Sequence, residues 1–160
     1  MRLHNNDWDY ETNCFVCEPT NGAGLQIPFF HDRAGERVVA DFSLGDAFSG
    51  APTMIHGGIS LAVLDEAMAW ACIAVGQRWA MTTETISRFE RPIMVDRPYR
   101  VEASIVDQQD AVIRTRAAIT FEHKGETKPC ATADASFTVL GEAHVTRLTG
   151  DTSPDTDYTR

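Results

Sequence analysis

The stretch from Ile59 to Val75 most constrains what this chain can fold into. Apart from Ser60, Asp65 and Glu66, every residue in it is small or apolar, so a helix here would be apolar on all sides. Such a helix has to be buried, because a surface helix keeps one polar face in water. We therefore predict one central helix, from about residue 58 to residue 75, enclosed by the rest of the chain.

The strand-like segments of the chain supply what could enclose this helix. Two extended segments precede it, a loop over residues 44–54 leads into it, and alternating apolar and polar segments follow it. We expect strands over residues 25–30, 37–42, 81–89, 99–106, 111–121 and 131–139. Four consecutive antiparallel strands can form a sheet around one buried helix. The prediction is a single α+β domain over residues 14–141, with a flexible segment over 1–13 and a polar tail over 142–160, disordered from Thr149.

Charge and composition narrow the class of protein. The formal net charge of −9 argues against nucleic-acid binding, which usually needs a basic surface. Asp65 and Glu66 interrupt the most apolar stretch, which argues against a membrane span. The first residues lack the apolar core of a secretory signal. We expect a cytoplasmic protein whose cysteines are thiols, with no nucleic-acid or membrane partner.

The start of the central helix carries the chemistry. His56-Gly57-Gly58 opens it, and Asp65 lies inside it. Glycines at a helix start let a ligand approach backbone N–H groups that have no partner within the helix. A carboxylate among apolar side chains has to be paired, hydrogen-bonded or protonated. Together they suit acyl transfer, although the glycines would also fit a plain tight junction and Asp65 a hydrogen-bonded core residue.

Three motifs together resemble the hotdog-fold acyl-CoA thioesterases, and more narrowly the PaaI-like thioesterases of the phenylacetate pathway. One is His-Gly-Gly with Asp65 nine residues after its histidine. The others are Cys-Phe-Val-Cys-Glu-Pro-Thr-Asn-Gly-Ala-Gly-Leu at residues 14–25, with Glu18 where the family more often has glycine, and a strand over residues 81–92 that ends in Arg-Pro. The resemblance covers roughly residues 14–140. It implies a curved antiparallel sheet wrapped around one long helix.

The same resemblance implies hydrolysis of an acyl-CoA thioester by a homodimer or a dimer of dimers. Active sites lie between subunits in such enzymes, and the only cofactor is the coenzyme A of the substrate. Asp65 would be the general base or the nucleophile, and the Gly57 N–H would bind the oxyanion. A threonine from the partner's next strand, Thr82 or else Thr83, would place the water next to Asp65. His56 would orient the substrate or donate a hydrogen bond to it.

Further residues are expected around the substrate. Gly58 would be a second backbone donor, and Leu61 and Met68 would line the acyl pocket. Four basic residues could hold the phosphates of coenzyme A or be ordinary solvated surface: Arg88, Arg91, Arg97 and Lys124.

Two further groups compete for a role. Glu66 points about 100° away from Asp65 on a helix, so we expect it to pair with an arginine or to face a subunit boundary. Cys14 and Cys17 could form half of a zinc site, but no second Cys-x-x-Cys pair follows. We therefore expect a structural pair of thiols and no metal.

Two other functions remain open from the sequence. A hotdog hydratase or dehydratase would act on 3-hydroxyacyl thioesters, although the Asp-x-Asn-Pro-x-His pattern of one such group is missing. A binding module would hold an acyl thioester without cleaving it. A serine nucleophile is not indicated, because the sequence has no Gly-x-Ser-x-Gly motif.

Overall fold

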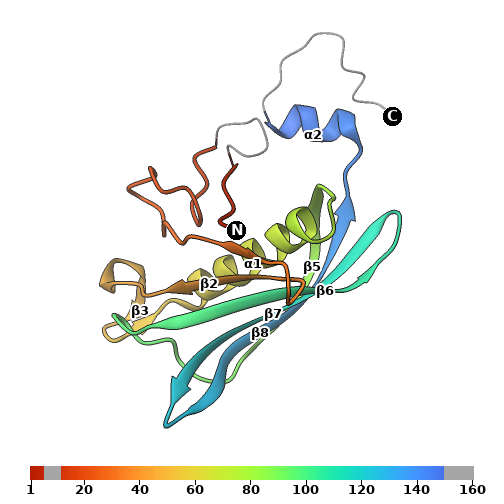
Figure 1. Ribbon diagram of the computed structural model, residues 1–160. Coiled ribbons are helices and arrows are strands. Elements are labelled where there is room, and N and C mark those ends of the chain that lie inside the picture. The colour runs from red at the N-terminus through yellow and green to blue at the C-terminus, as the bar shows by residue number, and fades with distance from the viewer. Residues whose placement is uncertain (6–11, 150–160) are drawn as a thin grey trace.

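One antiparallel sheet curves around one long helix (Figure 1). The structure is a computed structural model that describes residues 1–5 and 12–149. The main sheet has six strands in the order β1-β2-β6-β7-β8-β5, and the helix is α1. The elements are β1 (Phe30–Asp32), β2 (Arg37–Phe42), η2 (Asp46–Phe48), β3 (Ser49–Ala51), β4 (Met54–Ile55), α1 (Gly57–Ala74), β5 (Ala80–Phe89), β6 (Tyr99–Gln108), β7 (Val112–His123), β8 (Glu126–Val139) and α2 (Glu142–Thr149). The predicted α+β class is confirmed.

The apolar surface of α1 explains this arrangement. Val63, Leu64 and Ala67 are fully buried against the inner face of the sheet. On the facing strand β8, the apolar residues at alternate positions point inward and the polar ones outward, and Phe137 is wholly buried. By length and composition α1 could cross a membrane, but the sheet packs along it, as around the core helix of a globular domain.

Strand β5 forms one edge of the sheet and contains an irregularity that matters for the site. It pairs with β8, and the register shifts between Thr82, opposite Phe137, and Glu84, opposite Ser136. Thr83 is the extra residue of this β-bulge. A bulge reverses which residues face inward, so Thr82 before it and Ser87 after it both face α1.

The approach to α1 is more ordered than the loop predicted over residues 44–54. It contains the short 3₁₀ helix η2 and the hairpin of β3 and β4. Gly50 of this hairpin packs closely on His56: a Cβ at residue 50 would lie 3.0 Å from the His56 Cα. The hairpin therefore fixes the entry into the helix.

The first predicted strand, over residues 25–30, is mostly irregular. Strand β1 begins only at Phe30. The N–H groups of Leu25 and Ile27 donate instead to the carbonyls of Phe15 and Val16, at 2.7 and 2.9 Å. Pro28 has no N–H to continue a ladder.

Both ends of the described chain are more ordered than predicted. Residues 1–5 lie along β1: the Leu3 N–H donates to the Phe29 carbonyl at 2.9 Å, and the Leu3 side chain is buried. At the other end, residues 142–149 form α2, which places Val145 and Leu148 beside Trp79. The rest of the predicted flexible ends, residues 6–11 and 150–160, lies outside the described residues.

The enclosure of α1 predicts that the inward side of β8 is essential for stability. Phe137→Ala removes a fully buried ring facing the helix, so we expect the free energy of unfolding to fall by about 3–5 kcal/mol. Urea unfolding followed by circular dichroism measures this loss. Val106→Ala, at an exposed apolar position of β6, is the control and should change stability by less than about 0.5 kcal/mol. Equal effects of the two substitutions would contradict this account of the core.

Candidate functional site

Asp65 and Thr82 form the centre of the candidate site. Asp65 is half-buried on α1, and the Thr82 hydroxyl donates a hydrogen bond of 2.8 Å to its Oδ1. Asp65 forms no ion pair with any described residue. The expectation was a water between Asp65 and a threonine of the partner subunit. Instead, Thr82 and Asp65 of the same chain are hydrogen-bonded directly. This is possible because Thr82 lies before the β-bulge, where its side chain faces α1.

A pocket of about 390 Å³ opens beside this pair. Its lining consists of Leu61, Ala62, Asp65, Thr85 and Ser87. The Ser87 hydroxyl is buried and has no hydrogen-bond partner within the described chain, so a polar acceptor or donor is left facing this region. Sequence reasoning missed Thr85 and Ser87, because simple alternation from Thr82 would place them on the outer face.

The His-Gly-Gly segment leaves one backbone donor open. His56 is the N-cap of α1, and its Nδ1 accepts a hydrogen bond of 2.9 Å from the Gly58 N–H. The Gly58 N–H expected for the substrate is thus already used. The Gly57 N–H has no hydrogen-bond acceptor among residues 1–5 and 12–149. Of the two glycines, Gly57 offers the free donor, at the positive end of the helix dipole.

Gly57 and Asp65 are too far apart to act on one ester group within one chain. Eight residues of α-helix separate them, which is about 12 Å along the axis. Reacting atoms have to lie about 3–3.5 Å apart. One chain therefore carries two separate parts of a candidate site, which we call half-sites. One is the backbone donor at the start of α1, and the other is the carboxylate about two turns later.

Of the two apolar residues expected to line the acyl pocket, only one does so. Leu61 is partly exposed and lines the pocket beside Asp65. Met68 does not: it is fully buried in the core, because its side of α1 faces the sheet. Thr83, the alternative to Thr82, is the bulge residue, and its hydroxyl donates to the Ser136 carbonyl at 3.0 Å.

Arg88 and Arg91 both lie away from the Asp65 pocket. Arg88 follows the bulge at an outward position opposite Thr132, so it lies on the other face of the sheet from Asp65. Arg91 lies beyond the end of β5, where it donates to the Pro129 carbonyl at 2.7 Å. It lines a different and larger hollow.

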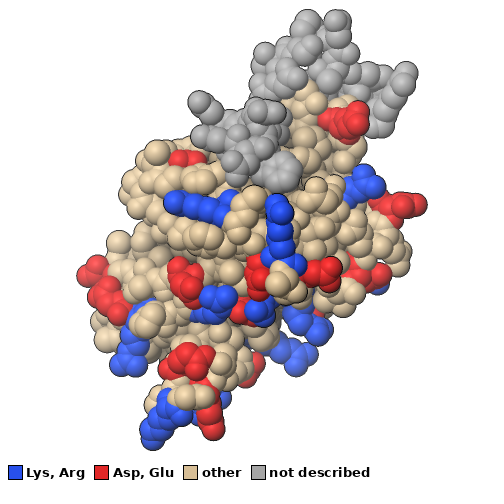
Figure 2. Space-filling view, viewed as in Figure 1, with Lys and Arg blue, Asp and Glu red and all other residues tan. Residues whose placement is uncertain are grey.

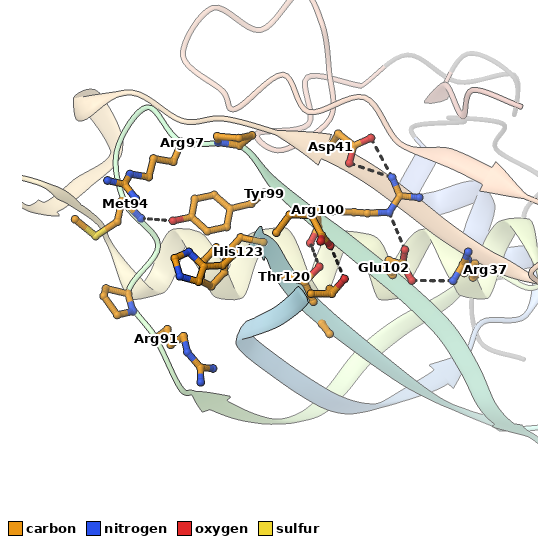
Figure 3. Close-up of a pocket in the computed structure, with 16 residues that line it drawn as sticks. Arg37, Asp41, Arg91, Met94, Arg97, Tyr99, Arg100, Glu102, Thr120 and His123 are labelled. Atoms are coloured by element: carbon orange, nitrogen blue, oxygen red, sulfur yellow. Dashed lines mark hydrogen bonds and ion pairs between the residues drawn. The ribbon is translucent and has the colours of Figure 1, made fainter. Parts of the chain in front are cut away.

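That larger groove, of about 1070 Å³, lies over the β2, β6 and β7 strands and the loop before β6 (Figure 3). Arg91, Arg97 and His123 surround one end of it, next to Tyr99. Along its wall, Arg100 is ion-paired with Asp41 and Glu102, at 3.0 and 2.7 Å. The face of the molecule shown in Figure 2 likewise carries basic and acidic side chains interspersed with one another. Neither Asp65 nor Gly57 lines the groove, so it is not where the carboxylate would act.

Glu66 lies beside the two N-terminal cysteines, not beside an arginine as expected. Its Oε1 is 3.4 Å from the Cys14 Sγ. Burial is the main reason why the pKa of Glu66 rises to about 8. Hydrogen bonds from the Cys17 thiol and from nearby backbone N–H groups lower the pKa of Cys14 to about 5, while donation to Cys14 raises the pKa of Cys17. The Cys14–Cys17 pair is visible in the sequence, but its contact with Glu66 is not, because 52 residues separate Cys14 from Glu66.

The family model described as Thioesterase superfamily matches residues 53–128, which include α1, Asp65 and Thr82. No curated protein sequence matches the chain.

Solved structures share the fold. A thioesterase superfamily protein aligns with a TM-score of 0.71 and 22% identity over 79% of this chain, and the chain spans only 60% of that protein. The PaaI protein of the E. coli phenylacetic acid degradation operon aligns with a TM-score of 0.60 and 19% identity, over 66% of this chain and 74% of that one. A Streptococcus mutans protein bound to acetyl CoA aligns with a TM-score of 0.61 and 16% identity, over 66% and 82%.

These likenesses establish how the central helix and its sheet are arranged, and the family match covers the segment that carries the Asp65 half-site. The chain therefore has the hotdog fold of the thioesterase superfamily, and the resemblance to PaaI-like thioesterases predicted from its motifs is confirmed.

Proposed function

We propose that this protein hydrolyses an acyl-CoA thioester to a free acid and coenzyme A, in an active site shared by two subunits. The observation that carries the proposal is the Asp65 carboxylate, held by Thr82 beside a pocket and free of any ion pair with a described residue. The thioesterase family match over this segment supports it. The similar S. mutans protein bound to acetyl CoA supports an acyl-CoA as the substrate.

In this mechanism Asp65 activates the water. The Thr82 hydroxyl occupies Oδ1 and leaves Oδ2 to take a proton from water as it attacks the thioester carbonyl. The carbonyl oxygen becomes an oxyanion that accepts a hydrogen bond from the Gly57 N–H. When the C–S bond breaks, the coenzyme A thiolate takes the proton back from Asp65. Direct attack by Asp65, which forms an anhydride that water then cleaves, is the other route for the same carboxylate.

The geometry of α1 favours a site between subunits. Because Gly57 and Asp65 of one chain are about 12 Å apart, the carbonyl next to Asp65 needs a donor from elsewhere. A second α1 running antiparallel to the first would bring the partner's Gly57 beside Asp65. By the two-fold symmetry of a dimer, the same contact would form a second, identical site.

The outer edge of β5 offers the surface for such a dimer. This strand is ten residues long, it pairs with β8 on one side, and Met81, Ile86 and Phe89 are more than half exposed. A long edge strand with exposed apolar side chains is a template for pairing with another chain. Phe89 also lies next to the start of α1, where its ring is 3.8 Å from a Cβ built on Gly57. A homodimer through β5 is therefore the assembly we propose, and two such dimers could associate further.

The phosphates of coenzyme A would bind near the start of α1. The loop that carries Arg91 and Arg97 is joined to the residue before His56, because the Ile55 N–H donates to the Ile93 carbonyl at 2.8 Å. Arg97 forms no ion pair with a described residue. Guanidinium groups in this position suit phosphate oxygens.

The role of Asp65 predicts the effect of an isosteric substitution. Asp65→Asn keeps the shape of the side chain and removes the base, so we expect kcat for acyl-CoA cleavage to fall by about 10²–10⁴-fold. Release of free thiol from short, long, branched and aryl acyl-CoAs measures it, and crotonyl-CoA hydration is followed in parallel. Asp107→Asn, which changes a partly exposed carboxylate of β6 paired with Arg114, serves as the control. More than a tenth of wild-type kcat in Asp65→Asn, or hydration without thiol release, would refute the proposal.

The two neighbouring threonines give a matched pair. Thr82→Val removes a hydrogen bond to a carboxylate, which is worth about 1.5–3 kcal/mol, so kcat should fall by roughly 10- to 100-fold. Thr83→Val removes a hydroxyl that bonds only a carbonyl of β8, and its kcat should stay within about threefold of wild type. Thiol release is again the measurement. If Thr83→Val lowered kcat more than Thr82→Val, the Thr83 hydroxyl and not the Thr82 hydroxyl would position the water.

Gly57 allows a direct test of the backbone donor. Gly57→Pro removes the N–H at the first helical position, where proline is well accepted, and should lower kcat by about 10²–10³-fold. Gly57→Ala keeps the N–H and meets no atom closer than 3.8 Å, so it should stay active. Refolding Asp65→Asn together with Gly57→Pro should restore about a quarter of wild-type activity, since half of the dimers are mixed and each has one intact site. Failure of the mixture to regain activity would place both groups in one subunit.

A further inference from the structure

A second cluster of reactive groups lies on another side of α1 from the Asp65 pocket. Cys14 and Cys17 lie in a turn before β1, and Glu66 reaches them from the helix. One ligand atom from each of these residues lies within 4.8 Å of the other two, and all three side chains are partly buried. The hydrolysis proposed above uses none of them.

The spacing of this cluster is that of a zinc site. In a tetrahedral site with Zn–S of about 2.3 Å and Zn–O of about 2.0–2.2 Å, a sulfur and an oxygen ligand lie about 3.5 Å apart. The Cys14 Sγ and the Glu66 Oε1 are 3.4 Å apart. This pair already has the separation that a zinc ion requires, and the Cys17 Sγ lies within 4.8 Å of both atoms.

The surroundings already orient the sulfur atoms. The N–H groups of Val16 and Cys17 point at the Cys14 Sγ, at 3.3 and 3.5 Å. The Asn5 side-chain amide donates to the Cys17 Sγ at 3.4 Å. Such hydrogen bonds from outside the ligand set fix the ligands of a metal site and tune them.

The chemistry of the donors selects the ion. Two cysteine sulfurs with one carboxylate favour zinc or a similar soft divalent metal, whereas magnesium and calcium take oxygen ligands. Glu66 also has no cationic partner among the ion pairs of residues 1–5 and 12–149. A divalent metal would supply the positive charge that this partly buried set of anionic ligands lacks.

We propose that Cys14, Cys17 and Glu66 bind one Zn²⁺ ion, which links the N-terminal turn to the central helix. Three protein ligands leave the fourth tetrahedral position for water or a further side chain. The lead-in motif at residues 14–25 and the acidic pair in α1 would then have separate roles, with Glu66 for the metal and Asp65 for catalysis. The site does not depend on the proposed hydrolase activity.

Cobalt substitution tests the site without an activity assay. The full chain is reduced, stripped with a chelator and titrated with Co²⁺ alone. We expect one equivalent to bind, with the near-ultraviolet charge-transfer band of thiolate ligands and the intense visible bands of a tetrahedral ion. One equivalent of Zn²⁺ should abolish both and raise Tm by roughly 5 °C or more at saturation. The reduced protein showing no thiolate band in excess Co²⁺ would overturn the proposal.

Variants assign the ligands. Replacing both cysteines, in Cys14→Ser/Cys17→Ser, should abolish the thiolate-to-cobalt band, and Glu66→Gln should weaken Co²⁺ binding by at least tenfold while both sulfurs still bind. The controls are Cys130→Ala, which removes a buried cysteine elsewhere in the core, and Glu18→Gln, which changes the carboxylate next to Cys17 that accepts hydrogen bonds from Thr20. Both controls should bind Co²⁺ as wild type does. A thiolate band that survives in the double variant, or an affinity unchanged in Glu66→Gln, would show that these residues are not the ligands.

Discussion

The packing of an apolar helix inside a curved sheet is the interaction on which the rest of this structure depends. Since α1 has no polar face, five strands of the sheet pack along it. Its two carboxylates are thereby placed at points where the sheet leaves an opening. Asp65 reaches one opening, beside the edge strand β5, and Glu66 reaches another, beside the N-terminal turn. Two adjacent carboxylates thus have different neighbours and suit different chemistry.

Most of the fold could be predicted from the sequence, because the signals that define it are local. The apolar run predicts α1 to within one residue at each end, alternation predicts β6, β7 and the later part of β8, and β2 is predicted as a strand after a turn. The shorter elements could not be predicted in the same way. The hairpin of β3 and β4 and the helix α2 depend on contacts with residues distant in sequence, such as those of Gly50 with His56.

The candidate site also contains residues that could be predicted from local sequence and residues that could not. Asp65, Gly57 and Thr82 are identified by motif, and the structure adds what each one contacts. The residues that the motif does not cover depend on a single bulge at Thr83, which turns Ser87 toward the pocket and Arg88 away from it. The position of such an extra residue in a strand cannot be recognised from the alternation of apolar and polar residues in the sequence. The meeting of Glu66 with Cys14 likewise arises from tertiary packing alone.

Gly50 illustrates how a solvent-exposed position can matter as much as a core one. It lies on an outer hairpin, yet any side chain there would press on the backbone of His56, whose imidazole caps the first turn of α1. The geometry of the Gly57 amide thus depends in part on a residue seven positions earlier. Variation tolerated at most surface loops would be selected against here, and a survey that ranked positions by burial alone would overlook it.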